Sequence, residues 1–217
     1  MGGVECKNKS NNMEILERLF GSAAKVKVIK LFLFNKDEAY DTLQTSERSQ
    51  VSVGVARKEI NNLARIGFLR PRIYTKEIRR QKNRRMSIGR KKAHGWTLDT
   101  KFPYIEALEL FLTNINPFRH KEMIQKLSRA GKIQLLIISG IFIKDPDSRV
   151  DLLVAGDNLK QGMLDGIIKN IESEIGKEIR YTAFETSEFN YRNSMFDKLI
   201  RDILDYPHEK IINKLNL

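Results

Sequence analysis

The chain has very few of the residues that build disulfides and metal centres. Its 217 residues include one cysteine, Cys6, and three histidines, His94, His120 and His208. A single thiol forms neither an intrachain disulfide nor a zinc cluster, and the scattered histidines match no metal-ligand spacing and no Ser-His-Asp arrangement. We therefore expect no metal, no cofactor and no conventional hydrolase chemistry.

Long apolar runs are also missing. No stretch approaches the 18 or so consecutive apolar residues of a membrane span, and the N-terminus lacks the charged-then-apolar pattern of a secretory signal. The sequence thus predicts a cytoplasmic protein with no membrane partner. Its length and its 41% hydrophobic content are sufficient for two compact domains.

Positive charge is abundant, and it is concentrated in one segment. Residues 70–92 contain eleven Lys or Arg and one acid, Glu77, and so carry +10 of the net charge of +12. Charge spread evenly would indicate only solubility, and a solvated loop is the alternative here. Eleven bases against one acid instead favour a surface that binds a polyanion such as nucleic acid.

The N-terminal third shows the spacing of short helices. Residues 1–12 are polar and aperiodic, which predicts a disordered leader. A short helix is expected up to Gly21, and a second over residues 23–34 with Ser22 as its N-cap. A third short helix is predicted from Tyr40 to about Gln44, followed by polar residues up to Val51.

A further helix beginning after Ser52 has two distinct sides. Ser52 is a plausible N-cap, and Gly67 stands where a helix C-cap glycine belongs. One side carries the apolar residues Ala56, Ile60, Leu63 and Ala64. The other side carries residue types that contact phosphates or read base edges in the major groove, namely Arg57, Lys58, Asn61, Asn62 and Arg65.

The next segment carries a family resemblance. The step Ile66-Gly67-Phe68-Leu69-Arg70 leads into a basic, β-rich stretch that returns through Gly95-Trp96-Thr97-Leu98-Asp99. Over residues 13–116 this resembles winged-helix transcriptional regulators, whose recognition helix is followed by a β-hairpin wing. The wing is longer than usual here, because residues 74–89 are inserted between its strands, and Trp96 is expected to close it onto the helices.

The resemblance implies a double-stranded DNA partner. Ser52 would contact phosphate, and Arg57, Lys58 and Asn61 would enter the major groove. The wing would follow the backbone or the minor groove. RNA remains an alternative partner, because Tyr74 or Trp96 could stack on an RNA base. The wing residues assigned to DNA are Arg72, Lys76, Arg79, Arg80, Lys82, Arg84, Arg85, Arg90, Lys91 and Lys92.

Residues 103–117 form a predicted linker helix that starts at Pro103 and is broken by Asn116-Pro117. In the regulators that the chain resembles, the equivalent helix often pairs two subunits. Packing onto the chain's own helices is an equally good interpretation, so a homodimer stays open.

Residues 118–217 have an α/β pattern. We expect a helix to about residue 130, strands over 133–138, 150–155 and 178–184, a helix over 159–175 and a closing helix over 187–204. The predicted fold class is therefore α/β (α+β). A winged helix-turn-helix over 13–102 is followed by the helix 103–117 and a small α/β domain with a mixed sheet of three or four strands.

The segments Ile138-Ser139-Gly140 and Asp147 to Val154 are similar to the nucleotidyltransferase superfamily, over residues 118–206. The resemblance implies a Gly-Ser phosphate cradle and an Asp-x-Asp pair that binds Mg²⁺. Here the cradle reads Ser139-Gly140, Arg149 stands at the first acidic position, and only Asp151 is kept. We expect a degenerate nucleotide site that is catalytically inactive. Binding of a nucleotide or another anion as an effector remains an alternative.

These patterns together predict a DNA-binding transcriptional regulator with an inactive nucleotidyltransferase-like domain that serves regulation or assembly. Two alternatives remain. The chain could be an active nucleotidyltransferase brought to nucleic acid by the basic segment, or an RNA-binding or antitoxin-type protein.

Overall fold

The computed structural model describes residues 12–82, 85–114, 120–145 and 147–217. The leader predicted over 1–12 therefore lies almost wholly outside the described residues. The fold is mixed α/β with two sheets. It divides into a first unit of Met1–Pro117 with Ser173–Lys177, and a second of Phe118–Glu172 with Glu178–Leu217. No helix in the described ranges has the length and apolar character of a membrane span.

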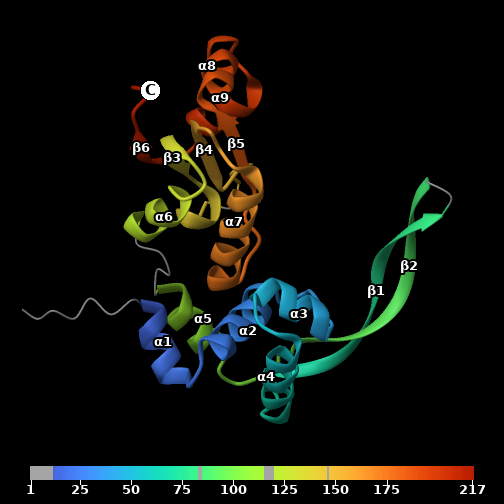
Figure 1. The fold of residues 1–217 in the computed structure, drawn as a ribbon. Helices are drawn as coiled ribbons and strands as arrows, with labels where there is room; N and C mark the ends of the chain where they lie inside the picture. The colour runs from blue at the N-terminus through green and yellow to red at the C-terminus, as the bar shows by residue number, and fades with distance from the viewer. Residues whose placement is uncertain (1–11, 83–84, 115–119, 146) are drawn as a thin grey trace, which may run out of the picture. The chain divides into compact units, whose positions relative to one another are not determined.

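Four helices open the first unit: α1 (Asn12–Phe20), α2 (Ala23–Phe34), α3 (Thr42–Ser49) and α4 (Val53–Arg65) (Figure 1). The hydroxyl of Ser22 accepts the backbone N–H of Lys25 at 3.0 Å and so caps α2, as predicted. Residues on most sides of α2 are buried, among them Val28, Phe32 and Leu33. α2 is therefore the central helix of this unit.

The prediction for α3 was wrong in its bounds. The helix covers Thr42–Ser49 rather than 40–44, because Asp41 and Gln44 form a capping box that starts it one residue after Asp41. Its buried residues are the polar Thr45, Ser46 and Ser49. A helix that buries hydroxyls shows no apolar period, so the sequence pattern could not reveal its second half.

The two strands β1 (Leu69–Lys82) and β2 (Arg85–Leu98) form one antiparallel hairpin with unbroken register from the Leu69–Leu98 pair to the Lys82–Arg85 pair. The hairpin runs away from α2, α3 and α4 (Figure 1). The insertion expected between the strands thus lengthens the strands themselves. At the hairpin base, Trp96 exchanges two backbone hydrogen bonds with Tyr40 (3.0 and 2.9 Å) and packs against the core, as predicted.

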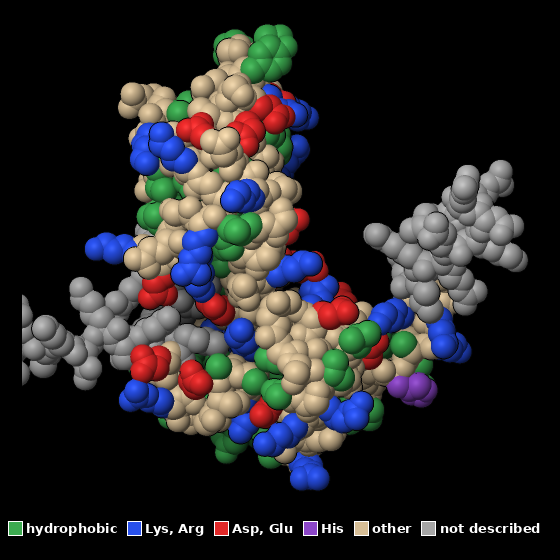
Figure 2. Space-filling model, in the orientation of Figure 1, with side chains coloured by type: hydrophobic (Ala, Val, Ile, Leu, Met, Phe, Trp, Pro, Cys, Tyr) green, Lys and Arg blue, Asp and Glu red, His purple; other side chains and the backbone are tan. Residues whose placement is uncertain are grey.

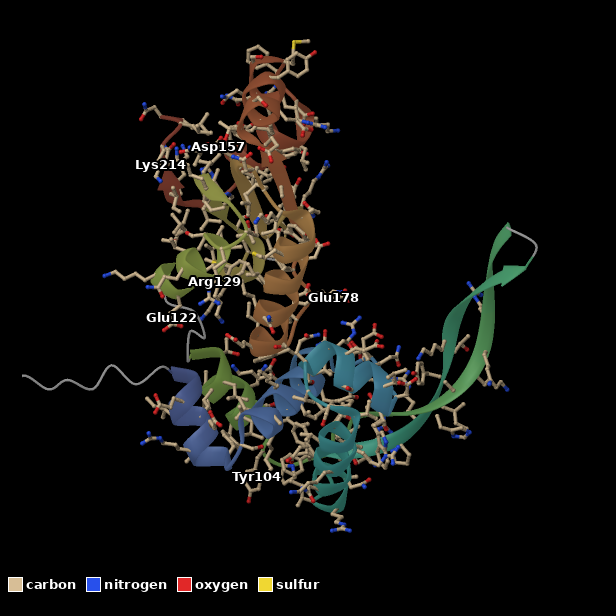
Figure 3. The ribbon with its side chains drawn as sticks, viewed as in Figure 1. Tyr104, Glu122, Arg129, Asp157, Glu178 and Lys214 are labelled. Atoms are coloured by element: carbon tan, nitrogen blue, oxygen red, sulfur yellow. The ribbon has the colours of Figure 1, made fainter. Side chains whose placement is uncertain are left out.

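The linker helix α5 (Ile105–Asn114) packs within its own unit. Ile105 and Leu112 are buried in the core cluster, and Leu108 packs against it. Leu110 and Tyr104 stay 66% and 64% exposed, and Tyr104 lies on the outside of the unit (Figure 3). Intramolecular packing is thus observed for one side of this helix.

The second unit contains a four-stranded sheet of order β5-β4-β3-β6. β4 and β5 are parallel, and the other neighbours are antiparallel, which confirms the predicted mixed sheet. Asp157 and Lys214 lie at one end of the sheet (Figure 3). The elements in chain order are α6 (His120–Leu127), β3 (Lys132–Ile138), a 3-10 turn (Gly140–Phe142), β4 (Leu152–Asp157), α7 (Gln161–Ile175), β5 (Tyr181–Glu185), α8 (Thr186–Ser194), α9 (Lys198–Asp205) and β6 (Glu209–Asn213).

Two details of this unit differ from the prediction. The closing helix is two helices, because Phe196 adopts a left-handed φ of 55° and Asp197 caps α9 by accepting the backbone N–H of Leu199 at 2.8 Å. Strand β6 was not predicted. It is only five residues long, with polar or charged residues at three positions, so its sequence shows no clear strand pattern, and its pairing with β3 defines it.

Candidate nucleic-acid interface

The turn between α3 and α4 is fixed by local hydrogen bonds. Gln50 takes a left-handed φ of 51° and its N–H donates to the carbonyl of Glu47 at 3.3 Å. The hydroxyl of Ser46 donates to the carbonyl of Val51 at 2.6 Å. The Ser52 hydroxyl then accepts the N–H of Val55 at 3.4 Å and caps α4, as predicted. These bonds hold α4 in a set orientation to α3.

The buried side of α4 holds Ala56, Ile60 and Leu63, as predicted, and also Glu59. Glu59 is 6% exposed, and its Oε2 has no hydrogen-bond partner among the described residues. Because the one acid of this helix is turned inward, the exposed side of α4 carries no negative side chain.

The exposed side of α4 is basic and polar. Arg57, Lys58 and Asn61, all predicted site residues, are exposed, and so are Ser52 and Arg65. Figure 2 shows Lys and Arg side chains gathered over α4 and the start of the hairpin. Within the described parts of the chain, no hydrogen bond or ion pair engages the Arg57 or Lys58 side chain. Both are available to an external anion.

Two of the predicted wing residues hold the hairpin to the segment that precedes α3. The ammonium of Lys76 lies 2.7 Å from Asp41 Oδ2, and the Arg72 guanidinium donates to the carbonyl of Asp37 at 2.8 Å. The Tyr74 hydroxyl donates to Gln44 Oε1. Sequence reasoning missed these contacts, because Asp41 and Lys76 are 35 positions apart.

The charge of Asp41 is favoured by this arrangement. Burial raises the pKa of its carboxyl, but the hydrogen bonds from the Gln44 backbone and from Lys76, together with the charge of Lys76, outweigh burial. The net result is a pKa below the ordinary value of 3.8. Asp41 is therefore ionised at neutral pH, where it both caps α3 and binds the hairpin.

The outer hairpin is basic on both faces. Arg90, Lys91 and Lys92 are exposed, and adjacent strand residues point to opposite faces. Lys91 stands opposite Lys76 in the register, and Lys92 opposite Thr75. Arg79, Arg80, Lys82 and Arg85 occupy further strand positions, but their side chains lie outside the described residues, and so does all of Arg84.

The second predicted site lies in the loop between β3 and β4, and the structure brings three of its four residues together. Ser139 and Gly140 follow β3 directly and lie beside Asp151. The Ser139 hydroxyl donates to the carbonyl of Val150. Gly140 has a left-handed φ of 55°, and a Cβ there would lie 2.0 Å from Asp151 Oδ1. The glycine is thus required by the buried carboxylate itself.

Asp151 is fully buried and fully engaged by its neighbours. Its Oδ1 accepts the N–H of Ile141 at 3.0 Å, and its Oδ2 accepts the backbone N–H of Arg180 at 2.8 Å. The Arg180 guanidinium adds two hydrogen bonds of 3.1 Å each. The bond to Asp151 raises the pKa of Arg180. The Asp151 carboxylate is therefore already paired with a protein cation.

The fourth residue, Arg149, points elsewhere. Its guanidinium lies 2.7 Å from Asp202 Oδ2 in α9, and its side chain is 64% exposed. In the described ranges, no three His, Cys, Asp or Glu side chains gather as metal ligands would. The arrangement is that of a loop braced by ion pairs.

The chain matches no protein-family model, no curated protein and no solved structure. Its function must therefore be inferred from its own residues and geometry.

Proposed function

We propose that the chain is a double-stranded DNA-binding transcriptional regulator of the winged-helix type. α4 is the recognition helix in the major groove, and the hairpin β1–β2 is the wing. One observation carries the proposal: an exposed helix side with no acidic residue stands on the same small helical unit as a long basic hairpin. Either feature alone would be weak, but together they supply a groove-sized reader and a phosphate-binding arm.

The residues divide by their contacts. Arg57, Lys58 and Asn61 read base edges, and Ser52 contacts a phosphate at the start of α4. The cations from Arg79 to Lys92 neutralise phosphates along the wing. Lys76 and Arg72 act indirectly, because their bonds to Asp41 and Asp37 set the direction of the wing.

Salt dependence tests this proposal. If about six wing cations neutralise phosphates, the plot of log affinity against log salt has a slope near −5. Changing Arg79, Arg80, Arg84 and Arg85 to Glu should weaken binding and flatten the slope strongly. Unchanged affinity and slope in this variant would rule the wing out as the DNA contact.

A matched control separates this effect from total charge. Changing Arg129, Lys160, Lys169 and Lys198 to Glu makes the same change in net charge on exposed positions of the second unit. This control should bind duplex DNA with nearly the original slope. Competition with duplex RNA at matched salt distinguishes the RNA-binding alternative, which predicts that RNA displaces the DNA.

The second unit is, in this proposal, an inactive nucleotidyltransferase-like domain that serves regulation or assembly. The support is the Asp151–Arg180 pair, because the Arg180 guanidinium already binds the one carboxylate that the resemblance offers for a metal. Incubation with labelled nucleotides and Mg²⁺ or Mn²⁺ is expected to give no label transfer. Transfer that disappears in Asp151→Asn would overturn this part and favour the enzyme alternative.

We also propose that two copies of the chain form a dimer. Leu110 in α5 and Tyr104, which precedes this helix, are exposed, and a symmetric dimer would cover this apolar area. Light scattering should give the mass of a dimer, and Leu110→Glu should give a monomer. A monomer at all concentrations would remove the dimer from the proposal and leave DNA binding untouched.

A further inference from the structure

The exposed side of α4 has a gap in its row of side chains. Gly54, Lys58, Asn61 and Arg65 follow one another at intervals of four, three and four residues, so they line one side of the helix. The last three carry long or polar side chains, and the first carries none. On this side of α4 the backbone is therefore uncovered at Gly54, whereas side chains project from the helix farther along.

No neighbour among the described residues requires glycine at this position. Gly54 does not adopt a left-handed backbone conformation, and a Cβ built on it meets no atom within 4 Å. By contrast, Gly95 and Gly140 are each crowded by neighbouring atoms. Glycine weakens a helix relative to alanine. Gly54 thus lowers the stability of α4 without an internal reason.

The flanking residues are exposed and apolar. Val53 is 40% and Val55 38% exposed, and each points about 100° around the helix from Gly54. Beyond them lie the exposed cations Arg57 and Lys58. The surface therefore combines methyl groups and a bare backbone with positive charge and no acid. The major groove at a thymine offers the complement, because the 5-methyl group projects between two phosphate strands.

We propose that Gly54 is the point at which α4 comes closest to the floor of the major groove, with Val53 and Val55 in contact with thymine methyl groups. This rests on the proposed function and deepens it by naming the base chemistry that the helix reads. Glycine lets the backbone approach the base pair directly. Any side chain at position 54 would hold the helix away from it.

A pair of glycine substitutions tests the close approach. Gly54→Ala and Gly162→Ala both fill open space at the second residue of a helix, the latter in α7. Both should raise the melting temperature by about 2–4 °C. Only Gly54→Ala should weaken binding to a duplex selected from genomic fragments, by roughly tenfold or more. Affinity equal to that of the unchanged protein would overturn the proposal.

Removal of the thymine methyl tests the base chemistry. The selected duplex is prepared with deoxyuridine in place of thymidine, which keeps the hydrogen bonds and removes the methyl. Its affinity for the unchanged protein should fall about tenfold, and Val53→Ala/Val55→Ala should make the two duplexes bind nearly alike. Equal binding of both duplexes by the unchanged protein would overturn the proposed contact of Val53 and Val55 with thymine methyl groups.

The outcomes also separate this inference from the proposed function. If selection recovers no preferred duplex but binding keeps a steep salt slope, α4 reads no bases and the inference fails while DNA binding stands. If the unchanged protein binds no duplex at all, the proposed function itself fails.

Discussion

At the scale of single residues, Asp151 gives the sharpest test of the second unit. Its carboxylate is buried and ties the loop after β3 to Arg180, the residue before β5. Asp151→Asn removes the charge that Arg180 faces and places an amide N–H₂ against existing donors. The free energy of unfolding should fall by about 2–3 kcal/mol, measured by urea denaturation followed by circular dichroism. Asp147→Asn, on the exposed part of the same loop, should change it by less than about 0.5 kcal/mol.

A second residue-scale prediction concerns pH. The pKa of Asp41 is lowered in the folded protein, so its contribution to stability is complete above the ordinary value of 3.8. This contribution is lost as the pH falls through the lower folded value. Asp41→Asn should therefore reduce stability at pH 7 by about 1 kcal/mol, with a difference that shrinks below pH 4.

The effect of Asp41→Asn can be followed by the protein's own tryptophan fluorescence. Trp96 is the chain's only tryptophan, and it is bonded to Tyr40 beside this cap. Its fluorescence during denaturation at several pH values measures the effect. Asp37→Asn, at an exposed position nearby, serves as the control. An Asp41→Asn deficit that stays constant down to pH 2 would contradict the assigned role of its charge.

At the scale of elements, the hairpin depends on close contact at its base. A Cβ at Gly95 would lie 2.8 Å from the carbonyl oxygen of Tyr40 and 2.7 Å from a ring carbon of Tyr74. Gly95→Ala should thus force β2 away from Tyr40 and lower stability by about 1–3 kcal/mol. Thermal unfolding measures this, with Gly166→Ala in open space on α7 as the control. A melting temperature equal to that of the unchanged protein would show that β2 can move away from Tyr40 without loss of stability.

At the scale of the whole molecule, charge and core occupy different parts of the chain. Replacing residues 77–90 by Asn-Gly keeps the Lys76–Lys91 pair and lowers the net charge from +12 to +7. The buried residues of the first unit's core cluster lie outside this segment. Stability should therefore change by less than about 1 kcal/mol, whereas duplex DNA affinity and its salt slope should drop sharply.

Both results come from one purified variant, by thermal denaturation and by a salt titration of binding. A shortened protein that binds as before would contradict the assignment of the phosphate contacts to the outer hairpin. A shortened protein that fails to fold would instead show that the hairpin contributes to the core.

Local signals in the sequence predicted most elements. Ser22 and Ser52 cap helices where expected, and Gly67 ends α4 with a φ of 77°, because caps and turns depend on neighbouring residues alone. The break at Phe196 and the strand β6 were missed. The first is a backbone conformation with no glycine to mark it, and the second is defined by its partner strand.

The sequence by itself determined where the charge lies and which sides of the helices are apolar, since both follow from residue order and helical or strand period. Only the tertiary structure decided what individual charges do. Lys76 holds the hairpin to the rest of its unit because folding places Asp41 beside it. Asp151 received Arg180 as its partner across 29 positions of chain. Such partners depend on the approach of distant segments, which no local pattern records.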